Sequence, residues 1–258
     1  MSNFQADDIF REESGAKRVL RGVSIFSAST RITELAGRVG FETVWIDVEH
    51  GSAGYSEVES LCVAAEAAGV IPTVRIPNNN REHVLHGLEA GARILVVPMV
   101  NTADQANEVV LHGKFPPLGQ RGYNTRSRAV NFGLEGPVKE FEKANRRTCL
   151  FAQIETMDAV KNLESICQVT ALSGIFIGPG DLSQSMGKTG QFQDDKLIET
   201  VATCIQQAQN FGKYVGIFLS PGPMLDAVRK VGVDLIIAGG DISNLAVNWQ
   251  NLLKSLEI

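Results

Sequence analysis

The sequence predicts a single TIM barrel, and three observations lead to that fold class. Apolar runs bounded by Gly, Pro, Asn or Asp alternate with amphipathic helical patterns eight times along the 258 residues. The runs are apolar almost throughout, which is typical of parallel strands buried on both faces. The first run is not followed by the G-x-G-x-x-G turn expected of a doubly wound dinucleotide-binding sheet. Eight strand–helix units close a barrel, so we expect one domain over residues 1–258.

The expected elements alternate in chain order. Strands are expected at residues 19–26, 43–48, 70–76, 93–98, 149–154, 174–177, 214–219 and 233–238. Helices are expected at 30–39, 55–68, 81–90, 102–112, 137–145, 156–166, 181–186, 194–211, 222–231 and 242–256. Ser29 or Thr30 is suited to cap the first helix. Residues 115–136, rich in Pro, Gly and Arg, are expected to form a long irregular connection.

Composition narrows the class of protein. The formal net charge is −5, whereas a nucleic-acid-binding surface needs a basic stripe. No apolar run approaches the roughly twenty residues that cross a bilayer, and the first eight residues are too polar for a secretory signal. The four cysteines are widely separated and suit reduced core thiols. We therefore expect a cytoplasmic protein with no nucleic-acid partner and no membrane partner.

Polar residues gather where the expected strands end. The active site of a TIM barrel lies at the C-terminal ends of its strands, so side chains at these positions should converge. The polar residues there are Asp47, Glu49, His50, Arg75, Gln153, Glu155, Asp181 and Asp241.

Glu155 and Asp181 form a candidate metal site. They follow two successive strands and offer the hard oxygen ligands that Mg²⁺ prefers, with water and substrate completing its coordination. No group of His and Cys has the spacing of a structural zinc site. Two other interpretations stay open: Asp181 could simply cap a helix, and Glu155 could be a carboxylate favoured by a helix N-terminus.

His50 is the strongest candidate for acid–base chemistry, because it follows a strand end and Asp47 is close enough to orient it. Arg75 is suited to a carboxylate or a developing oxyanion, although it could instead be a structural partner of Asp47 or Glu49. The expected strands carry no interior lysine, and Lys213 stands only at the start of the seventh. Schiff-base chemistry is therefore disfavoured.

A family resemblance rests on an ordered set of motifs. They are Trp45-Ile-Asp-Val-Glu-His50-Gly, Val74-Arg75, Val97-Pro98-Met99-Val100, Pro116-Pro-Leu-Gly-Gln-Arg121-Gly, Gln153-Ile-Glu155 and Ile177-Gly-Pro-Gly-Asp181. With these motifs the chain resembles the HpcH/HpaI class II aldolases from about residue 19 to residue 245. This family includes 2,4-dihydroxyhept-2-ene-1,7-dioate aldolase, 2-keto-3-deoxy sugar acid aldolases and macrophomate synthase. The resemblance implies a TIM barrel assembled as a hexamer or trimer, with the last helix exchanged between subunits.

The resemblance also implies roles for the residues at the strand ends. Glu155 and Asp181 would hold a divalent ion (Mg²⁺, Mn²⁺ or Co²⁺) that binds pyruvate, and the backbone at Gly180 and Asp181 would receive the pyruvate carboxylate. Gln153 would support the ligand or a water on the metal. Arg75 would stabilise the enolate, and His50 with Asp47 would handle the proton of the aldol hydroxyl group.

Two further features depend on the resemblance. Glu89 matches the position from which family members send an acidic residue into a neighbouring subunit, although Asp is commoner there. Gly180 likewise replaces a commoner Ala. Arg126 and Arg128 suggest an anionic acceptor or product, or else are solvated loop residues.

The implied reaction is cleavage of a 4-hydroxy-2-oxo acid into pyruvate and an aldehyde by a metal-dependent carbon–carbon lyase. Oxaloacetate decarboxylation, or chemistry like that of macrophomate synthase, would use the same enolate. A non-catalytic barrel that binds a small anion is a third interpretation, but it predicts that one of these residues is missing, and none is.

Overall fold

A computed structural model describes residues 9–11 and 14–256 and contains a closed barrel of eight parallel strands. The strands are β1 (Leu20–Ile25), β2 (Thr43–Asp47), β3 (Ile71–Arg75), β4 (Ile94–Val97), β5 (Cys149–Ile154), β6 (Gly174–Ile177), β7 (Tyr214–Phe218) and β8 (Leu235–Gly240). Each strand pairs with the next in the chain, and β8 returns to pair with β1. The predicted TIM barrel is confirmed.

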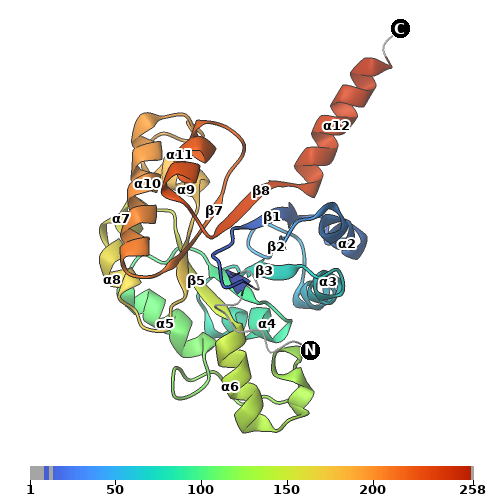
Figure 1. Ribbon diagram of the computed structural model, residues 1–258, viewed down its shortest axis with the longest axis vertical. Helices are drawn as coiled ribbons and strands as arrows, with labels where there is room; N and C mark the ends of the chain where they lie inside the picture. Colours follow the sequence, from blue (N-terminus) through green and yellow to red (C-terminus); the bar gives the residue numbers. More distant parts are fainter. Residues whose placement is uncertain (1–8, 12–13, 257–258) are drawn as a thin grey trace.

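Helices surround the barrel and connect its strands (Figure 1). They are α2 (Thr30–Val39), α3 (Tyr55–Ala67), α4 (Arg81–Glu89), α5 (Ala103–Gly113), α6 (Pro137–Arg147), α7 (Met157–Lys161), α8 (Leu163–Cys167), α9 (Pro179–Ser185), α10 (Asp195–Asn210), α11 (Pro223–Val231) and α12 (Asp241–Ser255). Ser29 caps α2, because its side chain accepts a hydrogen bond from the backbone N–H of Ile32. None of the described helices is long and apolar enough to cross a membrane.

The structure corrects three expected elements. The helix expected at 156–166 is divided into α7 and α8 at Asn162, whose side chain donates to the carbonyl of Asn101. The eighth strand begins at Leu235, after the buried Asp234, and continues to Gly240 opposite Ser24. The connection expected to be irregular contains a 3₁₀ segment, η1 (Arg128–Gly133).

The apolar core forms two layers, as a barrel requires. One layer lies between the strands and the surrounding helices, and the other fills the barrel interior. Large aromatic side chains occupy the interior: Trp45 and Phe176 lie with ring centroids 4.7 Å apart, and Trp45 meets Phe218 edge-on at 6.2 Å. This aromatic layer lies just below Asp47, two residues beyond Trp45 on the same strand.

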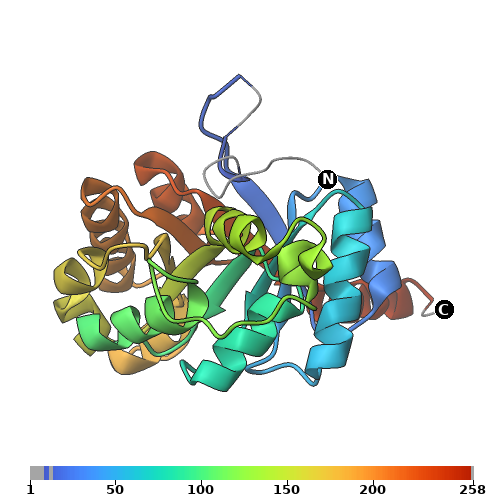
Figure 2. The same cartoon turned by 90° about the horizontal axis from the view of Figure 1, so that it is seen from below.

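The N-terminal segment closes the opposite end of the barrel. Phe10 is fully buried, and its ring stacks on Tyr214, at the start of β7, with a centroid separation of 4.2 Å. Figure 2 shows the segment that leads into β1 at one end of the barrel. The Lys213 ammonium group is also at this end and donates to the carbonyls of Val169 and Leu172. It is therefore far from the strand ends that would hold an imine-forming lysine.

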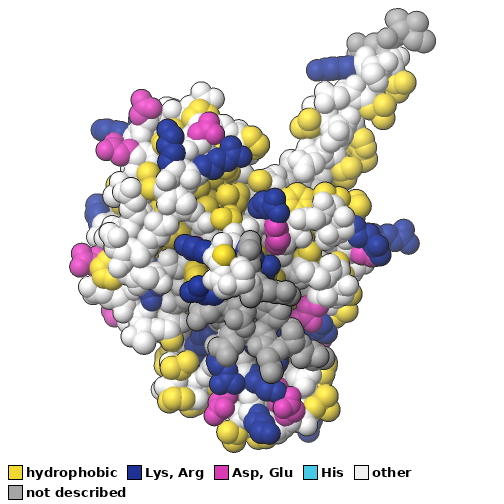
Figure 3. Space-filling view, viewed as in Figure 1, with side chains coloured by type: hydrophobic (Ala, Val, Ile, Leu, Met, Phe, Trp, Pro, Cys, Tyr) yellow, Lys and Arg dark blue, Asp and Glu magenta, His cyan; other side chains and the backbone are white. Residues whose placement is uncertain are grey.

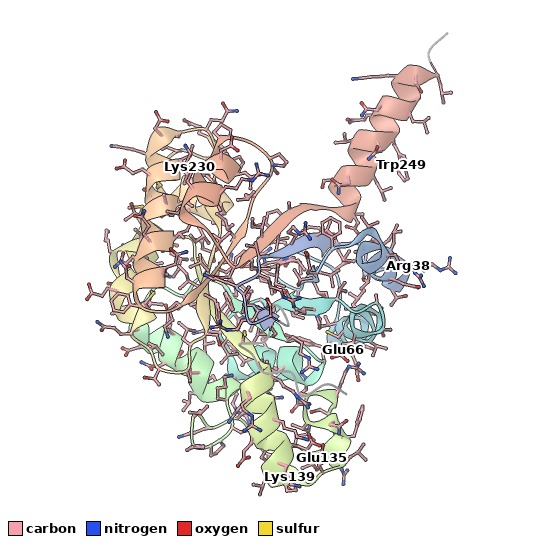
Figure 4. All side chains as sticks on the ribbon, viewed as in Figure 1. Arg38, Glu66, Glu135, Lys139, Lys230 and Trp249 are labelled. Carbon is pink, nitrogen blue, oxygen red and sulfur yellow. The ribbon has the colours of Figure 1, made fainter. Side chains whose placement is uncertain are left out.

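Helix α12 projects away from the barrel instead of packing on it (Figure 1). Its start is fixed by Asp241, which is buried and accepts hydrogen bonds from the backbone N–H groups of Phe26 and Ser27 at 2.9 and 3.0 Å. Apolar side chains beyond that point are exposed (Figure 3), and Trp249, labelled in Figure 4, is 65% exposed. The helix thus presents an apolar surface without a partner in the described chain.

Candidate active site

A cavity of about 490 Å³ opens at the C-terminal ends of the strands. Six residues predicted from the sequence line it: Asp47, His50, Arg75, Gln153, Gly180 and Asp181. Glu155 lies directly behind this lining and accepts a hydrogen bond from the Gln153 amide. Among the predicted site residues, Glu89 alone lies away from the cavity.

Arg75 is the centre of the polar wall. It lies opposite Asp47 in the β2–β3 register and holds both oxygens of that carboxylate, with Nε 3.1 Å from Oδ1 and Nη2 bonded to Oδ2. Its Nη1 forms an ion pair with Glu49 Oε2 at 2.9 Å. Its Cζ also lies 5.3 Å from the centroid of the Trp45 ring, a cation–π distance. The structural pairing considered for Arg75 therefore exists, and it fixes the guanidinium at the cavity wall.

Asp47 is held as a carboxylate although it is only 2% exposed. Burial by itself would raise the pKa of Asp47, but the hydrogen bonds and charge of Arg75, with the backbone N–H of His50, hold it below its ordinary value. The Trp45 indole also donates to Asp47 at 3.3 Å. A charge-assisted network of this kind is rigid, because each partner satisfies the other in a buried setting.

The connection after β2 folds back over Asp47 and places His50 at the cavity rim. Asp47 Oδ1 accepts from the backbone N–H groups of Glu49 and His50 at 3.0 and 3.1 Å. A Cβ atom on Gly51 would lie 2.0 Å from the Asp47 carbonyl oxygen, so the turn requires glycine. Asp47 thus orients His50 through the backbone. Within the described residues, no hydrogen bond joins its carboxylate to the imidazole ring.

Glu155 is a buried carboxylate with an unusual environment. It is 2% exposed, and burial raises its pKa to about 7, with the nearby charges of Glu49 and Asp181 adding to the rise. The backbone N–H of Met99 donates to Glu155 at 2.6 Å and partly offsets this effect. Met99 has a positive φ of 55°, a conformation that is costly for a non-glycine residue and often stored at functional sites.

Helix α9 begins two residues earlier than expected and corrects the interpretation of Asp181 as a helix cap. Gly178 is the N-cap, Pro179 is the first helical residue and Asp181 lies in the first turn. Gly180 and Asp181 are both exposed at the cavity. The N–H groups of a first helical turn have no partner within the helix, so they are available to an anion.

The donor set suits a hard divalent cation. Glu155 and Asp181 provide carboxylate oxygens from neighbouring strand ends, and Gln153 has a buried Oε1 with no hydrogen-bond partner among the described residues. Nowhere in residues 9–11 and 14–256 do three or more His, Cys, Asp or Glu side chains gather to hold a metal ion. Mg²⁺ is commonly bound through one or two carboxylates, with water and substrate at the other positions.

Glu89 lies at the end of α4 beside a separate polar hollow, which Arg126 and Arg128 also line. Arg128 is paired with Glu66, and Arg126 is exposed. Neither arginine lines the cavity at the strand ends of its own chain. The buried Arg121 guanidinium is held over the Phe115 ring at 4.6 Å and interacts electrostatically with Glu89.

Sequence reasoning missed one contributor to the site and part of the role of another. Glu49 was expected among the converging strand-end residues and as a possible partner of Arg75, and its charge also reaches Glu155 and Asp181. Met99 contributes only its backbone N–H, while its side chain is 50% exposed. The Asp-Val-Glu-His sequence signals Glu49, but no residue type signals the role of Met99.

Comparison with known proteins decides the family. Residues 22–247 match the profile of the HpcH/HpaI aldolase/citrate lyase family. The chain belongs to the HpcH/HpaI family. It is 31% identical to a hydroxypyruvate/pyruvate aldolase of Roseobacter denitrificans, covering 92% of each chain. It is 32% identical to a 2-keto-3-deoxy-L-rhamnonate aldolase of Klebsiella pneumoniae, covering 85% of this chain and 82% of that one.

The likeness extends to solved structures of the HpcH/HpaI family. An HpcH/HpaI aldolase from Desulfitobacterium hafniense DCB-2 superposes with a TM-score of 0.87 at 26% identity, covering 93% of both chains. The predicted family resemblance is confirmed, and the matched region includes every predicted site residue of this HpcH/HpaI member.

Two glycines beside the carboxylates provide a matched pair of variants. In Gly178→Ala the new Cβ would lie 3.0 Å from Glu155 Oε2 and 3.1 Å from Gln153 Nε2, so the carboxylate must shift. In Gly180→Ala the new Cβ meets nothing within 4 Å. We expect Gly178→Ala to weaken Mn²⁺ binding by about tenfold, the scale of effects at residues that support metal ligands, and Gly180→Ala to leave it unchanged. Calorimetric titration with Mn²⁺ tests this, and equal affinities in the two variants would contradict it.

The buried Glu155 gives metal-free protein a pH-dependent stability. Its pKa of about 7 in the folded chain lies above the ordinary value of 4.5, so the folded state binds this proton more tightly. The resulting stabilisation is complete below pH 4.5 and is lost as the pH rises through about 7. Relative to Glu155→Gln, the wild type should therefore lose on the order of 2 to 4 kcal/mol between pH 4.5 and 8. Thermal unfolding in chelator at several pH values measures the difference. Parallel pH profiles for the two proteins would show that Glu155 titrates normally.

Proposed function

We propose that the protein is a divalent-metal-dependent aldolase that cleaves 4-hydroxy-2-oxo acids to pyruvate and an aldehyde. The observation that supports this most directly is that two sets of side chains meet at one cavity: residues suited to acid–base chemistry and charge stabilisation, and a pair of carboxylates. The first group is Asp47, His50 and Arg75, and the second is Glu155 and Asp181 beside Gln153. Membership of the HpcH/HpaI family agrees with this chemistry.

The 2-oxo acid end of the substrate would lie between α9 and the carboxylate pair. The backbone N–H groups of Gly180 and Asp181 would bind the substrate carboxylate at the positive end of α9. Glu155 and Asp181 would hold the divalent ion (Mg²⁺, Mn²⁺ or Co²⁺), with Gln153 supporting the ligand or a bound water. When bound, this ion supplies Lewis acidity at the 2-oxo oxygen.

Arg75 would stabilise the negative charge that develops on the 2-oxo oxygen as the carbon–carbon bond breaks. A guanidinium has five N–H donors; Asp47 accepts hydrogen bonds from two of them and Glu49 forms an ion pair with Nη1, so donors remain for the substrate. Because both acidic partners hold its position, Arg75 needs little reorganisation during the reaction.

His50 would remove the proton of the 4-hydroxyl group. It stands at the exposed rim of the cavity, held by the backbone hydrogen bond to Asp47. Loss of this proton converts C4 into the aldehyde carbonyl while the C3–C4 bond breaks, and C3 then takes up a proton to give pyruvate.

The metal-dependence test compares retro-aldol release of pyruvate with and without EDTA. Chelation should abolish release, and Glu155→Gln and Asp181→Asn should lose both metal binding and turnover. Arg75→Ala should keep the metal but lower turnover by at least about a hundredfold, as expected when an oxyanion donor is removed. Full activity in EDTA would rule out the proposed metal chemistry. Oxaloacetate decarboxylation without cleavage of any 4-hydroxy-2-oxo acid would favour the decarboxylase alternative.

The same proposal includes a homo-oligomer, a trimer or hexamer, in which α12 is exchanged between subunits. Support comes from the exposed apolar side chains along α12, namely Ile242, Leu245, Val247, Trp249, Leu252 and Leu253. Glu89 also lies outside the cavity of its own chain, so it would complete the site of a neighbour, with Arg121 holding it in place. The four cysteines are buried and form no disulfide among the described residues, the state expected in the reducing cytoplasm.

Mixing two inactive variants tests the contribution of Glu89 across subunits. Glu89→Gln and His50→Ala should each be nearly inactive alone. After joint dissociation and reassembly in equal amounts, some sites would combine His50 of one chain with Glu89 of the other, so about a quarter of wild-type activity should return if subunits mix at random. Reassembled pure variants are the control. No recovery in verified mixed oligomers would show that Glu89 does not act across the interface.

A further inference from the structure

Much of the remaining wall of the cavity is apolar. It is formed by Phe26 after β1, Phe192 in the connection between α9 and α10, Phe218 at the end of β7, and Leu219 and Met224 beyond it. These side chains come from separate parts of the chain, yet they line one cavity.

Most of this apolar wall is held in place by packing. Leu219 and Met224 are only 5% and 4% exposed, and Phe218 packs edge-on against Trp45 in the aromatic layer. Phe192 is 48% exposed and forms the outer rim. A substituent that enters here would therefore meet fixed side chains at the base of the cavity and a more adaptable ring at its mouth.

Among the described residues of one subunit, the cavity lining has no unpaired Lys or Arg for a second substrate anion. Arg75 is the one Lys or Arg among the described residues that line it, and Asp47 and Glu49 already pair with it. The polar side chains on the far side, Gln193 and Ser220, are uncharged. A carboxylate at the distal end of a substrate would be desolvated against phenyl rings without a counter-charge, which is unfavourable.

We propose that the aldehyde released or accepted by this enzyme carries an apolar substituent, aliphatic or aromatic. This inference rests on the proposed aldolase function and names its substrate class: 4-hydroxy-2-oxo acids with an apolar group on C4. Cleavage breaks the C3–C4 bond, the 4-hydroxyl proton passes to the base, and C4 leaves as the aldehyde. The apolar wall holds the group on C4 while the carboxylate end stays at α9. Each additional methylene in such a pocket typically changes specificity by about 10- to 200-fold.

The experiment combines pyruvate with four aldehydes on Mn²⁺-loaded enzyme and compares kcat/KM. Hexanal and benzaldehyde should exceed glycolaldehyde and succinic semialdehyde by at least about tenfold. Binding of two unreactive analogues that lack the 4-hydroxyl group gives a readout without turnover. 2-Oxo-4-phenylbutanoate should bind at least about tenfold more tightly than 2-oxoadipate, which has a distal carboxylate. The reverse order in either measurement would overturn the inference.

Substitution of Phe192 should reverse the preference for apolar aldehydes with little risk to folding, because this side chain is exposed at the cavity rim. Phe192→Arg should lower kcat/KM for hexanal by at least about tenfold and raise it for succinic semialdehyde, which then gains a cation. Phe211→Arg is the matched control: Phe211 is also an exposed phenylalanine, at the end of α10, and does not line the cavity. Equal effects of the two substitutions would contradict a role for the apolar wall.

Exchange of the pyruvate methyl protons with D₂O separates the two levels of the proposal. This exchange requires the metal, Arg75 and the pyruvate site but no aldehyde. If the methyl protons exchange but the enzyme prefers succinic semialdehyde as the acceptor, the apolar acceptor is refuted and the aldolase proposal stands. Such a result would point to a cation supplied by a neighbouring subunit. Absence of exchange in metal-loaded enzyme would refute the aldolase proposal itself.

Discussion

The ion pairs of Arg75 are the interaction on which the site depends. They join the ends of β2 and β3, where Asp47 and Arg75 are register partners, and they bring Glu49 from the following connection to the same guanidinium. The Trp45 ring below supports this guanidinium and donates its indole N–H to Asp47. A half-buried arginine paired in this way costs desolvation energy that an apolar pair would not, so its presence at a strand end is better explained by chemistry than by stability.

The carboxylates of the site are in opposite electrostatic situations. Arg75 and backbone N–H groups favour the charged form of Asp47, whereas burial and neighbouring acids disfavour the charged form of Glu155. Environments that shift the pKa values of two acids in opposite directions are typical of functional sites. Here Asp47 fixes the Arg75 guanidinium and the connection that bears His50. Glu155 is the one whose environment would change most when a divalent ion arrives.

The fold and most of the site could be predicted from the sequence because strand ends in a barrel must converge. That rule placed Asp47, Arg75, Gln153 and Asp181 together without any knowledge of their contacts. The start of α9 was not predicted: proline fits the first helical position, and glycine takes the cap that had been considered for Asp181. The rule also could not find Met99, since a backbone N–H directed by a positive φ has no residue signature. The apolar wall was missed for a related reason: Phe26, Phe192 and Met224 are far apart in the chain, and only the tertiary structure shows that they meet.

Asp241 connects two parts of the molecule that otherwise have different tasks. It anchors the first turn of the projecting helix, and it does so by binding the backbone of Phe26 and Ser27. Phe26 is also part of the apolar wall. In the proposed oligomer, a change in the direction of α12 would therefore bear on the position of Phe26 in the cavity wall. Subunit contacts and the proposed acceptor preference would then share one carboxylate, and a change in either would also affect the other.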